Sequence, residues 1–315
     1  MTTEAESARR ARFPGIAPQA FEHPWDRAAL DTLRRSPGID VLFKKLAALG
    51  FERQVRLYFT ADSLRLSEMQ APDVHALLVD AACTLDAPMP DLYLWQNPMP
   101  NAFAIGMDRY AIVLSSGIVD LMDRDELRAV IGHELGHIKS GHMLYRTIAM
   151  SLAMIGMVAA RNLPFVNLMT QALMYALYDW YRKSELTADR AGMLVAQDKD
   201  VAARVLLKLA GGPTSTLGDV SIAAFLQQAD DYEEMDRSLL NVLYKFEMTR
   251  FQTHPFPALR AREVVRWSEA AEYATILQGS YARAAGGDER RRCAHCGASV
   301  GNPLYRYCPE CGGVL

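Results

Sequence analysis

The stretch DRDELRAVIGHELGHIKSGH (residues 123–142) predicts a helix with a well-defined start. Asp123 is a favourable N-cap residue, and Glu126, three residues later, completes the pattern of a capping box ahead of an apolar run. Gly136 lies in the helix interior, where a glycine costs ~1 kcal/mol relative to alanine. A glycine at that position indicates that another segment of the chain approaches the helix closely.

Two histidines on this helix are spaced to bind one metal ion. His133 and His137 are four residues apart, so they share one face of the helix. Glu134 follows the first histidine, and its carboxylate can reach a metal-bound water instead of the metal. The alternative is that ordinary hydrogen bonds satisfy both histidines. The H-E-x-x-H pattern favours a catalytic zinc site, which needs a third protein ligand and an open position for water.

The third ligand has two candidate sources. His142 lies nine residues after His133, which places it about 180° away on a continuing helix, so we expect a structural residue near the helix end. The segment KSELTADRAG (183–192) offers Glu185 and Asp189, which again share one helical face. One carboxylate can bind the metal while the other accepts a hydrogen bond from a ligand histidine. From spacing alone, an ordinary solvated carboxylate pair is the better explanation of Glu185 and Asp189.

Three motifs, taken together, resemble a known family. GHELGHIKSGH (132–142), SELTADRAG (184–192) and THPFPALR (253–260) follow one another in the order found in the zinc metallopeptidases that include the HtpX heat-shock protease and the CAAX prenyl proteases. The resemblance extends over roughly residues 70–270. It implies a zincin-like peptidase domain that hydrolyses peptide bonds in proteins, and a role in protein quality control.

The resemblance also implies a role for each site residue. It implies that His133, His137 and Glu185 bind the catalytic zinc. It implies that Glu134 is the base that activates the zinc-bound water, and that Asp189 is a supporting carboxylate.

Two further features of the family can be located in this chain. NAFAIG (101–106) looks like the edge strand that binds a substrate backbone through Asn101, Ala102, Phe103 and Ala104, although an ordinary hairpin strand has the same alternation. In the late His-Pro segment, the resemblance implies that His254 stabilises the developing oxyanion and that Arg260 pairs with a carboxylate of the site. A plain loop histidine is the alternative for His254.

The pattern outside these motifs indicates an α+β fold that is mainly helical, with a small β-hairpin or sheet beside the active-site helix. We expect helices at 26–50, 72–85, 163–178 and 182–197, strand-like alternation at 55–67, a strand at 91–96 and a β-hairpin at 101–117.

The apolar segment 147–178 is the least determined part of the chain. Its two halves, 147–160 and 163–178, are each shorter than the ~20 residues that span a bilayer unaided. Two interpretations stand: a buried helical hairpin, and a hairpin that dips into or lies on a membrane surface. Family members in membranes usually carry clear spanning helices, and this chain has none ahead of H-E-x-x-H.

Four cysteines near the C-terminus predict a second zinc site. Cys293, Cys296, Cys308 and Cys311 form two C-x-x-C pairs, the pattern of a zinc ribbon with a closed, structural ion. A redox dithiol is the alternative. The expected organisation is an N-terminal arm (1–25), a peptidase domain (26–281), a linker (282–292) and the ribbon (293–315).

Composition narrows the functional classes. The net charge of −3 gives no general reason to expect nucleic-acid binding, and the 50% hydrophobic share argues against disorder. The N-terminal residues carry no apolar segment behind their arginines, so we expect a cytoplasmic protein, with association at the inner face of the membrane as the alternative. The expected partners are protein substrates and a protein bound by the ribbon. The rival interpretations are a metal-binding adaptor with little turnover and a nucleic-acid factor that works through its ribbon.

Overall fold

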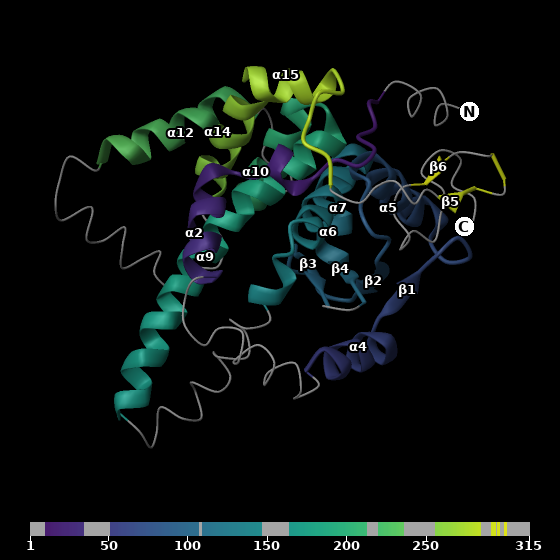
Figure 1. Cartoon of the computed structure of the whole chain (residues 1–315), viewed down its shortest axis with the longest axis horizontal. Helices are drawn as coiled ribbons and strands as arrows, with labels where there is room; N and C mark the ends of the chain where they lie inside the picture. The colour runs from purple at the N-terminus through teal and green to yellow at the C-terminus, as the bar shows by residue number, and fades with distance from the viewer. Residues whose placement is uncertain are drawn as a thin grey trace.

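The computed structural model describes residues 10–34, 51–106, 109–146, 164–212, 220–235, 256–284, 291–293, 295–296 and 299–300. Its helices are η1 (Pro18–Ala20), α2 (Pro24–Arg34), α4 (Phe51–Asp62), α5 (Pro72–Leu85), α6 (Ser116–Leu121), α7 (Arg124–Lys139), α9 (Pro164–Ala196), α10 (Lys199–Gly211), α12 (Ile222–Glu234), α14 (Pro257–Ser268) and α15 (Ala271–Leu277). Its strands are β1 (Leu64–Leu66), β2 (Asp91–Trp95), β3 (Ala102–Ile105), β4 (Ala111–Ser115), β5 (Arg291–Arg292) and β6 (Ser299–Val300). Figure 1 shows the mainly helical α+β arrangement that the sequence predicted.

One small mixed sheet lies beside α7. Its strand order is β1-β2-β4-β3, with β2 and β4 parallel and the other two pairs antiparallel. Every residue of β4 is buried, as expected for an inner strand, whereas β3 pairs only with β4 among the described strands. The expected hairpin at 101–117 is therefore confirmed as the pair β3–β4, in which Phe103 faces Val113.

Helix α7 forms where its local signals place it. Asp123 accepts a hydrogen bond from the Glu126 backbone N–H, while the Glu126 side chain accepts one from the Asp123 backbone N–H. This is the predicted capping box. Most of the helix between Glu126 and Ile138 is buried, because α5, α9 and α10 surround it.

The close approach predicted at Gly136 is made by α9. A Cβ atom on Gly136 would lie 2.5 Å from the Cβ atom of Ala191 and 3.1 Å from the Cα atom of Ala188. A second small residue of α7, Gly132, faces Val195 in the same way. The contact between α7 and α9 brings the two motif-bearing helices together.

The N-terminal segment packs onto this helical core. Phe13, Ile16 and Phe21 are almost completely buried in it. The backbone N–H of Ala17 donates to the carbonyl of Ala282, so two segments far apart in the sequence lie side by side. Helix α2 continues from this segment and runs alongside α9 (Figure 1).

Two secondary-structure predictions are wrong. Residues 55–62, expected to be a strand, belong to helix α4, and only Leu64–Leu66 form a strand there. The alternation is also compatible with a helix whose Phe59 packs on the aromatic residues of the sheet, and that contact decides the outcome. The expected end of a helix at Asp179 is absent, because α9 runs unbroken for 33 residues from Pro164 to Ala196.

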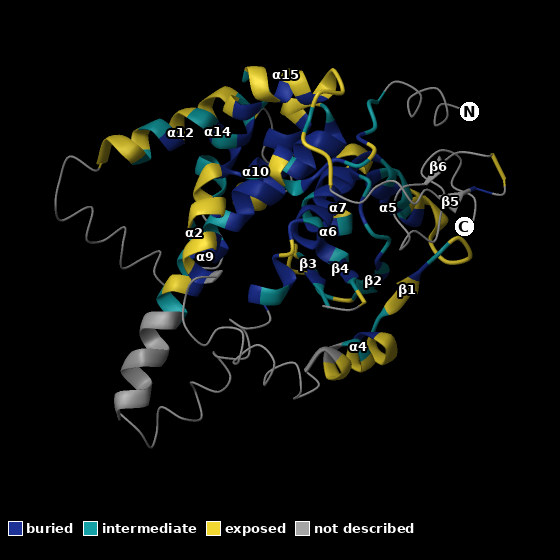
Figure 2. Cartoon of the chain, in the orientation of Figure 1, coloured by how far each residue is buried: buried dark blue, intermediate teal, exposed yellow. Residues whose placement is uncertain are grey.

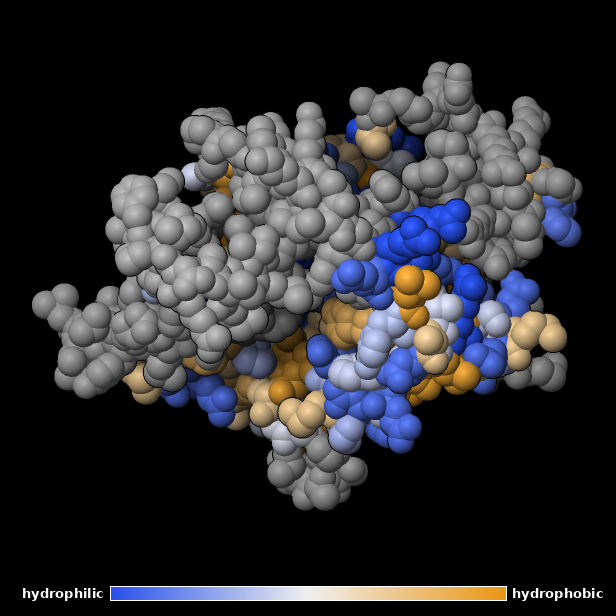
Figure 3. All heavy atoms as spheres, turned by 90° about the horizontal axis from the view of Figure 1, so that it is seen from below, coloured by the Kyte–Doolittle hydropathy of each residue, from blue (hydrophilic) through white to orange (hydrophobic). Residues whose placement is uncertain are grey.

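The apolar segment 147–178 is only partly described. Residues 147–163 lie outside the described part, and residues 164–178 form the first half of α9. Among the described helices, none combines the length and the hydropathy needed to cross a bilayer. In the face drawn in Figure 3, hydrophobic and hydrophilic side chains lie next to each other on the coloured part of the surface.

The predicted ribbon is also only partly described. Cys293 is buried and Cys296 is exposed, and β5 pairs with β6 as an antiparallel two-stranded sheet. Cys308 and Cys311 lie outside the described residues.

Candidate metal centre

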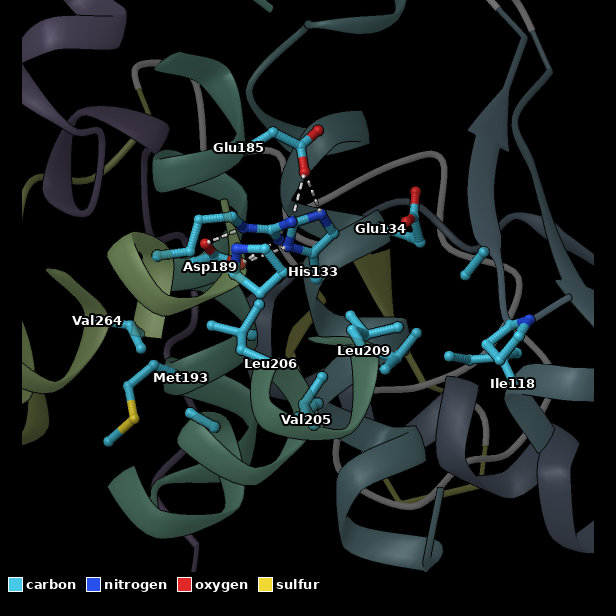
Figure 4. Close-up of a pocket in the computed structure, with 18 of the residues that line it drawn as sticks. Ile118, His133, Glu134, Glu185, Asp189, Met193, Val205, Leu206, Leu209 and Val264 are labelled. Atoms are coloured by element: carbon cyan, nitrogen blue, oxygen red, sulfur yellow. Dashed lines mark hydrogen bonds and ion pairs between the residues drawn. The ribbon is translucent and has the colours of Figure 1, made fainter. Parts of the chain in front are cut away.

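Helices α7 and α9 bring three metal-ligating side chains to one point. The ligand atoms of His133, His137 and Glu185 lie within 4.8 Å of one another. The His133 Nε2 atom is 3.4 Å from Glu185 Oε2, and the His137 Nε2 atom is 3.3 Å from Glu185 Oε1. Figure 4 shows the Glu185 carboxylate pointing toward the His133 side chain.

These separations match those of ligands that share one zinc ion. Ligand atoms arranged tetrahedrally about 2.0–2.1 Å from an ion are about 3.3–3.4 Å from each other. Two neutral imidazole nitrogens and one carboxylate oxygen are also a set that zinc binds in enzymes. On geometry and donor chemistry, the three side chains therefore fit zinc.

A buried ion pair orients the first histidine. The His133 Nδ1 atom is 3.0 Å from Asp189 Oδ1, and Arg260 donates from Nε and Nη2 to both oxygens of Asp189 at 2.8 and 2.7 Å. The Arg260 Nη1 atom lies 3.3 Å from Glu185 Oε2. Asp189 is therefore held by Arg260 on one side and accepts from His133 on the other, an arrangement that fixes the imidazole with Nε2 toward Glu185.

The charges of the site act on the two histidines in opposite directions. Burial disfavours the charged form of His133, but its hydrogen bonds to Asp189 and Glu185 outweigh burial and raise the pKa of His133 to about 9. Burial and the nearby charge of Arg146 hold the pKa of His137 well below its usual value. Burial would raise the pKa of Asp189, but Arg260 lowers it, so Asp189 stays ionised.

Glu134 faces the same site from α7. Its side chain lines the cavity beside His133, and its Oε2 atom is buried without a hydrogen-bond partner among the residues that the structure describes. The Arg146 Nη1 atom lies 3.9 Å away, and the Arg146 guanidinium stacks over the Tyr181 ring at 4.8 Å. A buried carboxylate oxygen of this kind is available to a water or a substrate group in the cavity.

The cavity in front of the site has a volume of about 400 Å³. Apart from the charged residues at one end and Asn101, its walls are apolar and come from α6, α7, α9, α10, α14 and the residues at the start of β3 (Figure 4). The apolar residues labelled in that view are Ile118, Met193, Val205, Leu206, Leu209 and Val264. A cavity with apolar walls can accommodate an extended peptide segment that carries an apolar side chain.

The residues of the predicted edge strand have different surroundings. Asn101 and Ala102 line the cavity. The ring of Phe103 packs on Phe59 of α4, with ring centroids 5.6 Å apart, so this side chain turns away from the site. Ala104 is buried in the core.

His142 does not lie where the sequence argument placed it. Helix α7 ends at Lys139 and the chain turns at Gly141, whose φ is +71°, so the assumption of a continuing helix is wrong. The turn brings His142 back toward the site, with its Nδ1 atom 3.0 Å from His137 Nδ1. His142 contacts a candidate ligand and is not part of the three-residue cluster among the described residues.

Sequence reasoning missed two neighbours of the site. Arg146 follows the helix in sequence, but its reach to Glu134 depends on the turn at Gly141. Asp26 lies more than a hundred residues before the H-E-x-x-H motif and contacts His142 at 3.0 Å. No local pattern marks either residue. His254 lies outside the described residues.

Comparison with known proteins gives a consistent set of matches. A family model described as peptidase family M48 matches residues 68–268. The chain is 38% identical over 269 residues to the plastoglobule-localized metallopeptidase 48, chloroplastic, of Arabidopsis thaliana, covering 84% of this chain and 77% of that protein.

Shorter matches are to proteins named protease HtpX homolog. They include those of Streptococcus gordonii, 39% identical over 31% of this chain and 35% of the relative, and Salinibacter ruber, 37% identical over 36% and 44%. The chain thus spans less than half the length of these two relatives. No solved structure matches the chain significantly.

Proposed function

The chain belongs to peptidase family M48, and from this premise we propose that it is a zinc-dependent endopeptidase with its active site between α7 and α9. The observation that carries the proposal is the convergence of two imidazole Nε2 atoms on one carboxylate at 3.4 and 3.3 Å. In this proposal His133, His137 and Glu185 hold the catalytic zinc. When bound, zinc lowers the pKa of a coordinated water toward ~7 and polarises the scissile carbonyl.

Glu134 is the general base in this proposal. It accepts a proton from the attacking water and passes the proton to the departing amine. Its buried oxygen, which has no hydrogen-bond partner among the described residues, supports this role, since a carboxylate already occupied by donors would be a poor proton acceptor.

Three other residues support the reaction in this proposal. Asp189 and Arg260 keep the His133 ring oriented, and the bidentate pair between them supports that assignment. His254 donates to the developing oxyanion, a contribution worth ~3–4 kcal/mol when such a donor is lost. This last role rests on the resemblance of its segment to the family.

We propose that β3 binds the substrate backbone. The backbone N–H of Ser115 donates to the carbonyl of Asn101, so Asn101 faces β4. Because hydrogen-bonding directions alternate along a strand, the backbone groups of Ala102 and Ala104 face the open edge. An extended peptide can add there as a further strand, with Asn101 and Phe103 holding β3 to the sheet. The apolar cavity then receives a substrate side chain next to the scissile bond.

The test is the Glu134→Gln variant. The wild type is expected to cleave an unfolded protein such as casein, to lose this activity with a chelator and to regain it with zinc. Glu134→Gln is expected to keep its zinc and to lose about 10²–10⁴-fold in kcat. Glu68→Gln, at an exposed position outside the cavity, is the matched control and should cleave normally.

The outcomes separate the candidate functions. Wild-type rates in Glu134→Gln would contradict the mechanism. A zinc-loaded wild type that cleaves no protein at all would instead favour a metal-binding adaptor that works through its ribbon.

The wider assignments are proposals of the same kind. We propose a role in protein quality control, in the cytoplasm or at the inner membrane face, with residues 147–178 either packed as a buried hairpin or in contact with the membrane. The proposed organisation is an arm (1–25), the peptidase domain (26–281), a linker (282–292) and a zinc ribbon (293–315) that binds a structural zinc through Cys293, Cys296, Cys308 and Cys311 and recruits a partner protein. A fractionation of cell extracts tests the location.

A further inference from the structure

A row of buried polar side chains extends from the metal centre to the N-terminal helix. His137 Nδ1 is 3.0 Å from His142 Nδ1, and His142 Nε2 is 3.0 Å from Asp26 Oδ2. Thr187 donates its hydroxyl to the same Asp26 oxygen at 2.6 Å and accepts from the backbone N–H of His23 at 3.0 Å. The His142, Asp26 and Thr187 side chains are fully buried, so water does not mediate or screen these contacts.

The order of donors and acceptors fixes the proton positions in this row. In the proposed function His137 uses Nε2 as its zinc ligand atom, so its proton resides on Nδ1, 3.0 Å from His142 Nδ1, and is donated to His142. His142 then accepts at Nδ1 and carries its own proton on Nε2, because an unprotonated nitrogen 3.0 Å from the Asp26 carboxylate would be repelled by it. Asp26 ends the row because an ionised carboxylate only accepts. The tautomers of His142 and His137 therefore both depend on the Asp26 carboxylate at the end of the row.

Asp26 is suited to that position. Burial would raise the pKa of Asp26, but the hydrogen bonds and charge of His142, with the hydroxyl of Thr187, lower it. The Trp180 ring packs edge-on against the His142 ring, with the ring centroids 5.6 Å apart. Asp26 is on α2, outside the residues that the family model matches.

The two ligand histidines are thus held differently. His133 donates directly to the Asp189 carboxylate, whereas His137 is linked to the Asp26 carboxylate through the imidazole of His142. Building on the zinc site of the proposed function, we propose that Asp26 and His142 are positioning residues that fix the tautomer and orientation of His137 for zinc. Helix α2 is then a component of the metal centre.

Two variants test this positioning role in the full-length protein. His142→Phe keeps a ring against Trp180 and removes both nitrogens, and it is expected to weaken zinc binding by about 10–100-fold. Asp26→Asn keeps an acceptor oxygen and removes the charge, and it is expected to weaken zinc binding by up to about 10-fold. Asp31→Asn, an exposed position on the same helix, is the control and should bind zinc normally.

The primary measurement is zinc affinity, obtained by competition with a chromogenic chelator. The visible spectrum of the cobalt-substituted protein reports the ligand geometry independently, and thermal unfolding of the metal-free protein reports the fold. The His133→Ala variant gives the signal of any metal bound elsewhere in the chain, which is then subtracted.

The outcomes are distinguishable. Weaker zinc binding and an altered cobalt spectrum in a folded variant support the positioning role. If His142→Phe does not fold, the zinc affinity of Asp26→Asn tests the positioning role. Unchanged affinity in a folded variant, even with lowered thermal stability, overturns the inference and leaves the row as packing of α2. A wild type whose zinc titration equals that of His133→Ala contradicts the proposed function itself.

Discussion

At the scale of single residues, two arginines on α14 differ in the carboxylates that they meet. Arg260 pairs with Asp189 and Glu185, whose side chains are 8% and 0% exposed. Arg262 pairs with Asp230 and Glu233, which are 46% and 55% exposed. Loss of Arg260 leaves two carboxylates buried without their cation, whereas water solvates the partners of Arg262.

We therefore expect Arg260→Ala to lower the free energy of unfolding of the metal-free protein by ~3–5 kcal/mol. Arg262→Ala, the matched control two positions along the same helix, should cost about 1 kcal/mol or less. Urea denaturation followed by circular dichroism measures both values. If Arg260→Ala and Arg262→Ala lowered the free energy of unfolding equally, the buried and exposed carboxylate partners would not explain the effect.

The ionisation of His133 gives the metal-free protein a defined pH dependence. Burial opposes the charge, but Asp189 and Glu185 raise the pKa of His133 to about 9 in the folded state. A pKa raised on folding stabilises the protein fully below the unfolded value of about 6.5, and this stabilisation is lost as the pH rises through about 9.

The free energy of unfolding of the metal-free protein should therefore fall between about pH 6.5 and about pH 9. Asp189→Asn removes one of the two carboxylates and should flatten this slope. Saturating zinc should abolish it, because the metal takes the place of the proton. Urea titrations across the window measure the slope, and a rise in stability with pH would contradict the expectation.

At the scale of secondary-structure elements, the contact between α7 and α9 determines the site. Each helix carries its functional residues at a spacing of four, and the small residues Gly136, Ala188 and Ala191 let the two backbones approach. Helix α9 is unbroken, so the same helix contains the apolar residues that begin at Pro164 and the site residues Glu185 and Asp189.

Gly136→Ala tests this contact. Alanine favours the helix by ~1 kcal/mol in isolation, but the added methyl group would lie 2.5 Å from the Ala191 Cβ atom. We expect a net loss of ~1–3 kcal/mol from overpacking, measured by thermal unfolding. Ala191→Gly, combined with Gly136→Ala, should recover part of the loss in a double-mutant cycle. Additive effects would mean that the two positions do not meet.

At the scale of the whole molecule, the chain is expected to hold two zinc ions in different settings. One lies between α7 and α9, and the other is the ribbon ion predicted from the cysteine spacing. Because a closed four-cysteine site and an open three-ligand site share no ligand, the two ions should be lost independently.

Elemental analysis is expected to find two zinc ions per full-length chain and one in a chain that ends at Arg292. Glu185→Ala in the shortened chain should remove the remaining ion. A zinc ion that survives this last change would place the third ligand elsewhere, and a full-length chain with one zinc would contradict the ribbon.

The sequence alone determined what depends on local spacing. A capping box, a helix that presents His133 and His137 together, and a hairpin at 101–117 follow from interactions within a few residues, and each is present. The close approach at Gly136 was also readable, because a glycine in a helix interior has a cost that packing must offset. The pairing of Glu185 with the histidines needed the resemblance to the family as well.

Only the tertiary structure decided what depends on distant contacts. Residues 55–62 form a helix because Phe59 packs on the aromatic residues of the sheet, and the same alternation would suit a strand. The turn at Gly141 reverses the direction of His142 and brings Arg146 to Glu134. Asp26 reaches the site because α2 packs along α9. Spacing fixes the face of a helix, whereas the neighbour of that face depends on how the whole chain packs.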